Sequence, residues 1–419
     1  MEDFAYQLSL LNDKAYYLST EPEILDFTAN KQWKFSVCSP KLKITTVVDR
    51  HSLALFLGVL AQTIFAQEAI FVWWDKKSFN SYCQFNLKKI PKLAGYDLRV
   101  VEAFSNLYKK RPENLVEAIN RLKACSNWKT LYQNLHEPLI SEVIPCIETT
   151  GLLNVPKRQA EYSYYEIEGT NHGRMSSSKQ FVKSFLPHTL SDDYKKSLKP
   201  RNNELFIYAD IKSCEIKALQ WLTKDPVLTD IVSSNQDMYR QIYELITTDN
   251  CNSDEKRKMS KDMILPVIYG CGANRLSEIL SIEVPACKDL INRTKRVFNH
   301  AFDWMDKIQD AALDGKSTDL FGRVRDFSKE PYKARNFIVQ GTAATVCQEK
   351  LIELHNNLKK CGKICYTLHD GYGIVAPIIT AKEAIKITKA TLESESKLCV
   401  GLKYNCEIKF GRDLFNLKQ

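Results

Sequence analysis

The sequence predicts an α+β protein with a small N-terminal α/β domain and a larger region built on a short antiparallel sheet. In residues 1 to about 150, runs rich in β-branched and aromatic residues alternate with helical apolar spacing. Farther along, two apolar strand-like runs each end at an aspartate. The chain has 419 residues, which is enough for two or three domains with separate cores.

The N-terminal part contains the clearest strand signals. We expect strands over 42–48 and 69–74, with a helix over 51–67 between them. A mixed polar segment with Gly151 and Pro156 follows and predicts a boundary. The expected organisation is therefore an α/β domain over 1–150, a connecting segment over 151–172, and the main domain over 173–419.

Composition limits the classes of partner. The formal net charge of +9 suits an anionic partner such as nucleic acid, although charge alone does not select one. No apolar run reaches about 18 residues, and the first residues do not form a secretory signal. We expect a cytoplasmic chain (host-cell cytoplasm if a virus or plasmid encodes it) without a membrane partner. The 13 scattered cysteines favour reduced thiols over a zinc site.

Two aspartates end predicted strands of the main domain. Asp210 follows a strand over 204–209, and Asp370 lies in the tight turn of a hairpin formed by 363–368 and 372–375. A single aspartate at a strand end is usually a turn former or a helix cap. Two on neighbouring strands could instead hold a pair of magnesium ions, which use one or two carboxylates plus substrate phosphates. Such a pair catalyses phosphoryl transfer.

A predicted helix over 253–280 carries a stripe that repeats every four residues, interrupted near Pro266 and Gly270. The stripe consists of Arg257, Lys261, Leu265 and Tyr269. Two cations four residues apart repel each other unless an anion lies between them, and a triphosphate would supply that anion. The alternative is a solvated basic face.

Six segments resemble, in order, the motifs of family A DNA polymerases, the bacterial DNA polymerase I type. They lie at 173–178, 210–216, 257–270, 320–323, 336–344 and 368–371. The resemblance covers roughly 60% of the chain, from about residue 170 onward. It implies a DNA-directed DNA polymerase with a right-hand palm and fingers. The N-terminal domain then takes the place of a ribonuclease H-like 3′–5′ exonuclease.

The resemblance also implies roles for individual residues. Asp210, Asp370 and the Ile211 carbonyl would bind two Mg²⁺ ions. Arg257 and Lys261 would bind the triphosphate, and Lys261 would also protonate the leaving pyrophosphate.

Other matched positions would face the nucleotide and the DNA. Glu215 would exclude a ribose 2′-hydroxyl, so deoxynucleoside triphosphates are the implied substrate. Leu265 and Tyr269 would lie beside the incoming nucleotide. The residues implied to contact primer–template DNA are Arg174, Asn336, Gln340 and His369. Minor-groove acceptors are nearly the same for every base pair, so such contacts test pairing geometry without reading sequence.

The chain departs from the family pattern in three places. Leu265 stands where an aromatic residue is usual, and Gly371 replaces the acid that commonly follows the aspartate matched by Asp370. Only about twenty residues separate Gly151 from Gly173, too few for a long helical thumb at about 1.5 Å per residue. We expect a missing or vestigial thumb, and therefore low intrinsic processivity or a separate clamp protein.

The N-terminal domain lacks an Asp-x-Glu pair on its early strands, and its nearest acids are Asp75 and Asp97. Asp97 is expected to be a helix cap. Two-metal hydrolysis needs clustered acids, so we predict no proofreading. Three alternatives stay open: a single-subunit phage-type RNA polymerase, a catalytically inactive binding subunit, and a metal-dependent nuclease. Glu215 and segment 336–344 favour DNA synthesis over the first.

Overall fold

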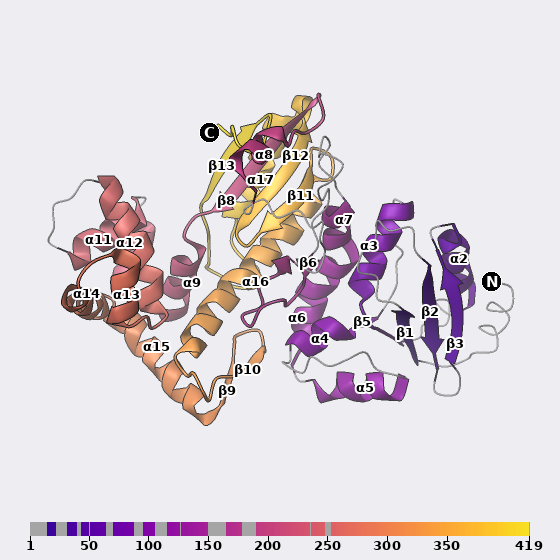
Figure 1. Cartoon of the computed structure of the whole chain (residues 1–419), viewed down its shortest axis with the longest axis horizontal. Helices are drawn as coiled ribbons and strands as arrows, with labels where there is room; N and C mark the ends of the chain where they lie inside the picture. Colours follow the sequence, from indigo (N-terminus) through magenta and orange to yellow (C-terminus); the bar gives the residue numbers. More distant parts are fainter. Residues whose placement is uncertain are drawn as a thin grey trace.

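The structure is a computed structural model. It describes residues 15–21, 32–39, 43–49, 51–63, 70–87, 95–104, 115–125, 127–149, 165–177, 190–234, 236–247 and 253–418. Along the longest axis, an N-terminal sheet lies at one end and a group of helices at the other, with a second sheet between them (Figure 1). Within the described residues, no helix is both long enough and apolar enough to span a membrane.

The N-terminal sheet has five strands in the order β3-β2-β1-β4-β5. Its strands are β1 (Ala15–Glu21), β2 (Trp33–Cys38), β3 (Lys43–Val48), β4 (Ile70–Trp73) and β5 (Tyr96–Asp97). Strands β1, β2 and β3 pair in antiparallel fashion, whereas β4 is parallel to β1 and β5 is parallel to β4. The strands predicted over 42–48 and 69–74 are confirmed as β3 and β4, and the helix between them as α2 (Leu53–Thr63).

Helices connect this sheet to the rest of the chain. The helices are α3 (Lys76–Leu87), α4 (Leu98–Phe104), α5 (Leu115–Ala124), α6 (Lys129–Leu131), η2 (Tyr132–His136), η3 (Leu139–Val143) and α7 (Ile144–Thr149). The apolar side chains of η2, η3 and α7 share one core with the second sheet. The boundary at residue 150 stays a prediction. Residues 151–164 of the predicted thumb remnant lie outside the described residues.

The second sheet, the palm sheet, has the order β11-β12-β8-β13, with antiparallel neighbours. Its strands are β8 (Glu204–Ile211), β11 (Lys363–Leu368), β12 (Gly371–Pro377) and β13 (Cys406–Gly411). The predicted strand before Asp210 and the predicted hairpin around Asp370 are both confirmed. Helices α16 (Lys333–Leu358) and α17 (Ile378–Glu393) pack against this sheet and share its core.

The group of helices at the far end, the predicted fingers, has its own apolar core. It contains α10 (Pro226–Ser233), α11 (Met238–Ile246), α12 (Ser253–Ile268), α13 (Ala273–Leu280) and α14 (Val284–Val297). Helix α9 (Cys214–Thr223) leads from the palm sheet into the fingers, and α15 (Asn299–Ala311) leads back. The predicted interruption of the 253–280 helix is confirmed at Gly270, whereas the interruption predicted at Pro266 is wrong, because α12 continues through Pro266 to Ile268. Gly270 adopts a positive φ of 85° between α12 and α13.

Short elements complete the fold. These are β6 (Tyr165–Glu166), β7 (Ser176–Ser177), α8 (Asp192–Ser197), η5 (Ala312–Asp314), β9 (Lys316–Thr318) and β10 (Val324–Asp326).

A fully buried cluster of charges joins these short elements to the palm helix α16. Arg323 Nε donates to both carboxylate oxygens of Glu168 at 2.8 and 2.9 Å, and Nη1 donates to Asp319 Oδ2 at 3.0 Å and to Thr345 Oγ1 at 2.9 Å. His136 Nε2 lies 3.0 Å from Glu168. Burial alone would raise the pKa of Glu168, but the charge of Arg323 and the contact with His136 hold it well below its ordinary value. Each buried charge in the cluster is therefore compensated.

Replacing Arg323 by Ala should lower the free energy of unfolding by about 3–5 kcal/mol, because it leaves two buried carboxylates without their cation. Urea unfolding followed by circular dichroism would measure this difference. The control is Arg275→Ala, which breaks an exposed ion pair with Glu278 and should cost about 1 kcal/mol or less. Equal losses for the two variants would contradict the assigned role of the cluster.

Candidate active site

The pairing of β8 with β12 brings the two predicted acids together. Asp210 lies opposite Gly371 in the antiparallel register. The Ile211 N–H donates to the Asp370 carbonyl oxygen at 3.0 Å. Asp210, on β8, and Asp370, in the turn that precedes β12, are far apart in sequence but therefore lie at the same end of the palm sheet.

The electrostatics of the two acids favour a cation. Burial and the nearby Asp370 charge raise the pKa of Asp210 from its ordinary 3.8 to about 6. The Tyr208 hydroxyl, which donates to Asp210 Oδ1 at 3.1 Å, offsets only part of this rise. On the other acid, Cys214 Sγ lies 3.6 Å from Asp370 Oδ2. Oxygen ligands of this kind suit Mg²⁺, which would relieve the repulsion between the carboxylates.

The described residues contain no cluster of three or more His, Cys, Asp or Glu that could hold a metal ion. The predicted metal ligands at the sheet end are the Asp210 and Asp370 carboxylates, with the Ile211 carbonyl predicted as a third donor, and a further carboxylate, Glu407, lies opposite Asp210 on β13. This donor set fits an ion that takes its remaining ligands from water and substrate phosphates.

Four other predicted site residues meet beside the start of α9. Arg174 forms an ion pair with Glu215 in the first turn of that helix. The Tyr269 hydroxyl is buried and faces Glu215 and Gln340 without a well-formed hydrogen bond to either. Burial and the Glu215 charge hold the pKa of Tyr269 well above its ordinary value. The structure thus places residues from the 173–178, 210–216, 257–270 and 336–344 segments in one location.

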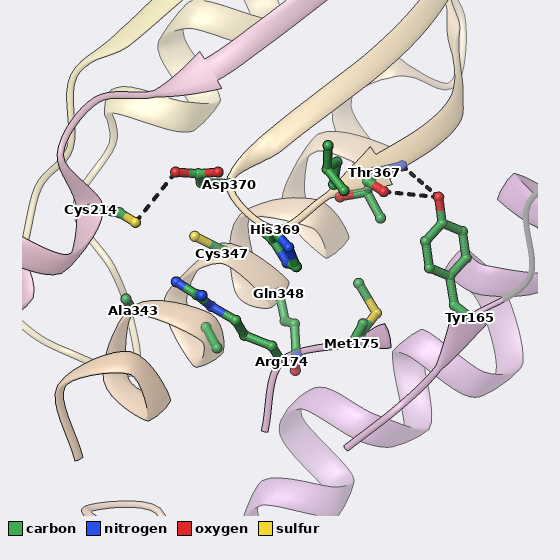
Figure 2. A pocket seen from close by; sticks show the side chains of 12 residues that line it. Tyr165, Arg174, Met175, Cys214, Ala343, Cys347, Gln348, Thr367, His369 and Asp370 are labelled. Atoms are coloured by element: carbon green, nitrogen blue, oxygen red, sulfur yellow. Dashed lines mark hydrogen bonds between the residues drawn. The ribbon is translucent and has the colours of Figure 1, made fainter. Parts of the chain in front are cut away.

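A small pocket lies between these residues and the turn that carries Asp370 (Figure 2). Arg174, His369 and Asp370 line it together with Cys214 and other side chains. His369 has a positive φ of 54°, which is uncommon for a residue other than glycine.

The pocket walls are fixed by hydrogen bonds to backbone groups. The Tyr165 hydroxyl accepts from Thr367 N and donates to Thr367 O, both at 2.9 Å, at the end of β11. Gln348 Nε2 donates to the Gly173 carbonyl at 2.8 Å. These contacts hold the turn and the segment before Arg174 on opposite sides of the pocket.

One residue of the stripe on α12, Lys261, lies near enough to Asp210 for its charge to act on this acid. Arg257 is exposed and donates to Asp237 Oδ2 at 2.8 Å, with its guanidinium 5.6 Å from the centre of the Tyr239 ring. Lys261 is exposed, and its charge is near enough to lower the pKa of Asp210 slightly. Leu265 packs against the fingers core. An anion that binds Arg257 must therefore compete with Asp237.

Two predicted DNA contacts share one face of α16. Asn336 and Gln340 are four residues apart and therefore lie one turn from each other. Asn336 Oδ1 is buried and, within the described part of the chain, has no hydrogen-bond partner. Buried polar atoms are usually satisfied, so this oxygen is available to a ligand that reaches the helix.

Sequence reasoning missed three residues of the site: Tyr208, Cys214 and Gln348. Tyr208 had a usable signal, because it precedes Asp210 by two residues on a strand and so shares its face. Cys214 lies within the 210–216 segment without a role of its own. Gln348 gave no signal, because its partner is a backbone carbonyl 175 residues earlier in the chain.

A palm sheet with paired carboxylates, flanked by fingers that carry cations, defines a polymerase fold. The chain belongs to DNA polymerase family A: the family model matches residues 88–415. The predicted family and fold class are therefore confirmed.

Curated relatives agree. The chain is 27% identical to the thermostable DNA polymerase I of Thermus filiformis over 73% of this chain and 37% of that protein. It is 23% identical to DNA polymerase I of Borreliella burgdorferi over 73% of this chain and 36% of that protein. The chain thus spans less than two-fifths of the length of these relatives.

Among solved structures, the polymerase domain of Pol1 from M. smegmatis, in complex with DNA primer–template and dNTP, matches with a TM-score of 0.75. The match covers 99% of this chain and 97% of that one at 12% sequence identity. At this level of identity the likeness shows the fold.

Replacing Asp210 by Asn should raise the thermal midpoint of the metal-free protein at pH 8. The folded state binds a proton on Asp210 more tightly than the unfolded chain, with a pKa of about 6 against 3.8. The acid therefore lowers stability while it is ionised, and this loss disappears as the pH falls through 6 toward 4. The gain in the variant should shrink over the same range, as followed by thermal melts with a chelator.

The control for this experiment is Asp230→Asn. Asp230 is exposed, so this substitution should change the thermal midpoint little at any pH. A loss of stability in the Asp210 variant at pH 8, or a gain independent of pH, would contradict the assigned repulsion.

Proposed function

We propose that the chain catalyses template-directed DNA synthesis, adding deoxynucleotides to a primer 3′ end with two Mg²⁺ ions. One observation carries the proposal: in a member of this family, Asp210 and Asp370 lie together at the end of the palm sheet. The raised pKa of Asp210 supports it, because two repelling carboxylates are suited to a shared divalent cation.

Asp210, Asp370 and the Ile211 carbonyl would hold the metal. Bound magnesium would activate the attacking primer hydroxyl and stabilise the leaving oxygen.

The α12 cations would bind the triphosphate. Arg257 would exchange Asp237 for a phosphate, to which a guanidinium also donates charge-assisted and often bidentate hydrogen bonds. Lys261 is exposed, and its charge is felt at Asp210, so it is placed to reach the phosphates and to protonate the leaving pyrophosphate. Leu265 follows on the same helix and Tyr269 lies directly after its end, and both would lie beside the new base pair.

Glu215 would select the sugar. Its carboxylate is mostly buried and held in place by Arg174. A fixed carboxylate at this position leaves no space for a 2′-hydroxyl, so deoxynucleotides are the proposed substrate.

Primer–template DNA would lie against α16 and the turn that carries Asp370. The unpartnered Asn336 Oδ1, the Gln340 amide and the Arg174 guanidinium supply donors and acceptors for the minor groove and the primer end. The exposed His369 borders the same pocket. The M. smegmatis structure that shares this fold contains primer–template DNA and a dNTP, which supports the same classes of ligand here.

In a primer-extension assay with Mg²⁺ and deoxynucleotides, the protein should lengthen a primed DNA template. Asp370→Ala should lower the rate about a thousandfold or more, because a metal ligand contributes several kcal/mol to the barrier. Ala at the exposed Asp230 is the matched control and should leave the rate unchanged. Extension by the Asp370 variant at the wild-type rate would exclude the proposed site.

The same assay with ribonucleotides tests the selectivity for deoxyribose over ribose, and with it the RNA polymerase alternative. The protein should discriminate against them, and Glu215→Ala should improve their incorporation by about tenfold or more, because the added space admits the 2′-hydroxyl. Glu215→Gln keeps the bulk and should retain the discrimination. A wild-type preference for ribonucleotides would favour the RNA polymerase alternative.

The N-terminal domain should not remove a mismatched primer end. Asp75 Oδ2 accepts from Arg99 Nη1 at 2.7 Å, and Asp97 caps α4 while accepting from the backbone N–H groups of Arg99 and Lys77, both at 3.1 Å. Both acids are thus already partnered. A labelled mismatched primer with Mg²⁺ and no nucleotide should keep its length. Shortening that disappears in Asp75→Ala would show a working nuclease.

Synthesis should be of low processivity, since the sequence leaves little room for a thumb between Gly151 and Gly173. With an excess of unlabelled primed DNA as a trap, each binding event should yield only short products. Addition of a clamp protein from the same host should lengthen them. Long products from the chain alone would contradict this proposal.

A further inference from the structure

Tyr208 contacts one of the two acids directly. It precedes Asp210 by two residues on β8, so both side chains leave the same face of the sheet. Its hydroxyl donates to Asp210 Oδ1 at 3.1 Å. Its ring is roughly parallel to that of Tyr366, with 6.4 Å between centroids and 22° between planes. The hydroxyl is therefore held in place by a packed ring.

The opposite strand has a glycine where this ring lies. A Cβ atom on Gly371 would clash with the Tyr208 hydroxyl and would lie 3.0 Å from Cζ of the ring. The φ angle of Gly371 is not positive, so the requirement for glycine is steric and comes from Tyr208. Tyr208 thus fills the space that a side chain at 371 would occupy, the position where the family pattern predicts an acid.

We propose that Tyr208 is a positioning residue for the proposed polymerisation, in that its hydroxyl orients the Asp210 carboxylate for metal binding while its ring replaces a side chain at position 371. The inference rests on the proposed function. A phenol suits this role, because it is a neutral donor at physiological pH and adds no charge to the two acids already present. The hydrogen bond fixes the rotation of the Asp210 carboxylate, a torsion that is otherwise broad.

Loss of a hydrogen bond to a metal-ligating carboxylate typically costs 10- to 100-fold in metal affinity or activity. Besides Tyr208, the groups that face Asp210 from the neighbouring strands are acids, Asp370 near β12 and Glu407 on β13. Among the described residues around Asp210, the Tyr208 hydroxyl is therefore the side-chain group that donates a hydrogen bond to this carboxylate.

The first experiment removes only the hydroxyl. Tyr208→Phe should raise the Mg²⁺ concentration for half-maximal nucleotide addition by about tenfold and lower kcat, with the KM for deoxynucleotide unchanged. Mn²⁺ binding, measured by electron paramagnetic resonance with a dideoxy-terminated primer–template and dNTP, should weaken by about the same factor.

The matched control is Tyr194→Phe. Tyr194 packs in the same apolar cluster as Tyr208, and its hydroxyl has no hydrogen-bond partner among the residues that the structure describes. This variant should match the wild type in both the Mg²⁺ and the Mn²⁺ measurement. Equal Mg²⁺ requirement and Mn²⁺ affinity for Tyr208→Phe and wild type would overturn the proposal.

The second experiment tests the fit between Tyr208 and Gly371. Gly371→Ala should lower the thermal midpoint in the wild-type background and much less in Tyr208→Ser, where the added methyl group has room. Gly371→Glu combined with Tyr208→Ser should regain part of the Mn²⁺ affinity lost in Tyr208→Ser alone. If the effects of the Gly371 and Tyr208 substitutions simply add in both double variants, the proposal that the Tyr208 ring replaces a side chain at position 371 is wrong. If the wild type extends no primer, the proposed function fails, but Mn²⁺ binding and the melts still decide the role of Tyr208.

Discussion

The antiparallel register of β8 and β12 is the constraint on which the site depends. Ile207, Ala209 and Ile211 alternate along β8 and are buried in the core shared with α16 and α17. Burial of these three side chains turns the intervening residues to the other face, which is how Asp210 reaches the side of the proposed metal site. A slip of one residue would exchange the two faces and bury the carboxylate, so the apolar core selects the arrangement of the proposed site.

A second constraint fixes Arg174. Gly173 has a positive φ of 79°, and a Cβ there would lie 2.6 Å from Cζ of the buried Arg323. The Gly173 carbonyl is held by Gln348 on α16. The segment before Arg174 is thus held between a buried ion-pair cluster and the long palm helix. Arg174 in turn forms an ion pair with Glu215. The buried Arg323 therefore supports, through the segment of Gly173 and Arg174, the residue proposed to select the sugar.

The sequence was enough to predict the features that depend on local pattern. The strand before Asp210, the hairpin turn at Asp370 and the break at Gly270 follow from alternation, turn chemistry and helix-breaking residues. The pairing of Arg257 with Asp237 and the fit of Tyr208 over Gly371 were not predictable, because each depends on how separate elements pack. The shared core of η2, η3 and α7 with the palm was missed for the same reason.

The charge around Asp210 argues for a working site over an inactive binding subunit. In the described part of the chain, the buried Glu168 is paired with Arg323, whose charge outweighs the effect of burial and holds the pKa of Glu168 well below its ordinary value. Asp210 instead faces the carboxylates of Asp370 and Glu407, and the Tyr208 hydroxyl donates a hydrogen bond to it. Two close carboxylates lower the stability of the fold unless a cation binds between them. Stability is therefore lost at the position where the proposed reaction needs a metal, and metal binding would restore it.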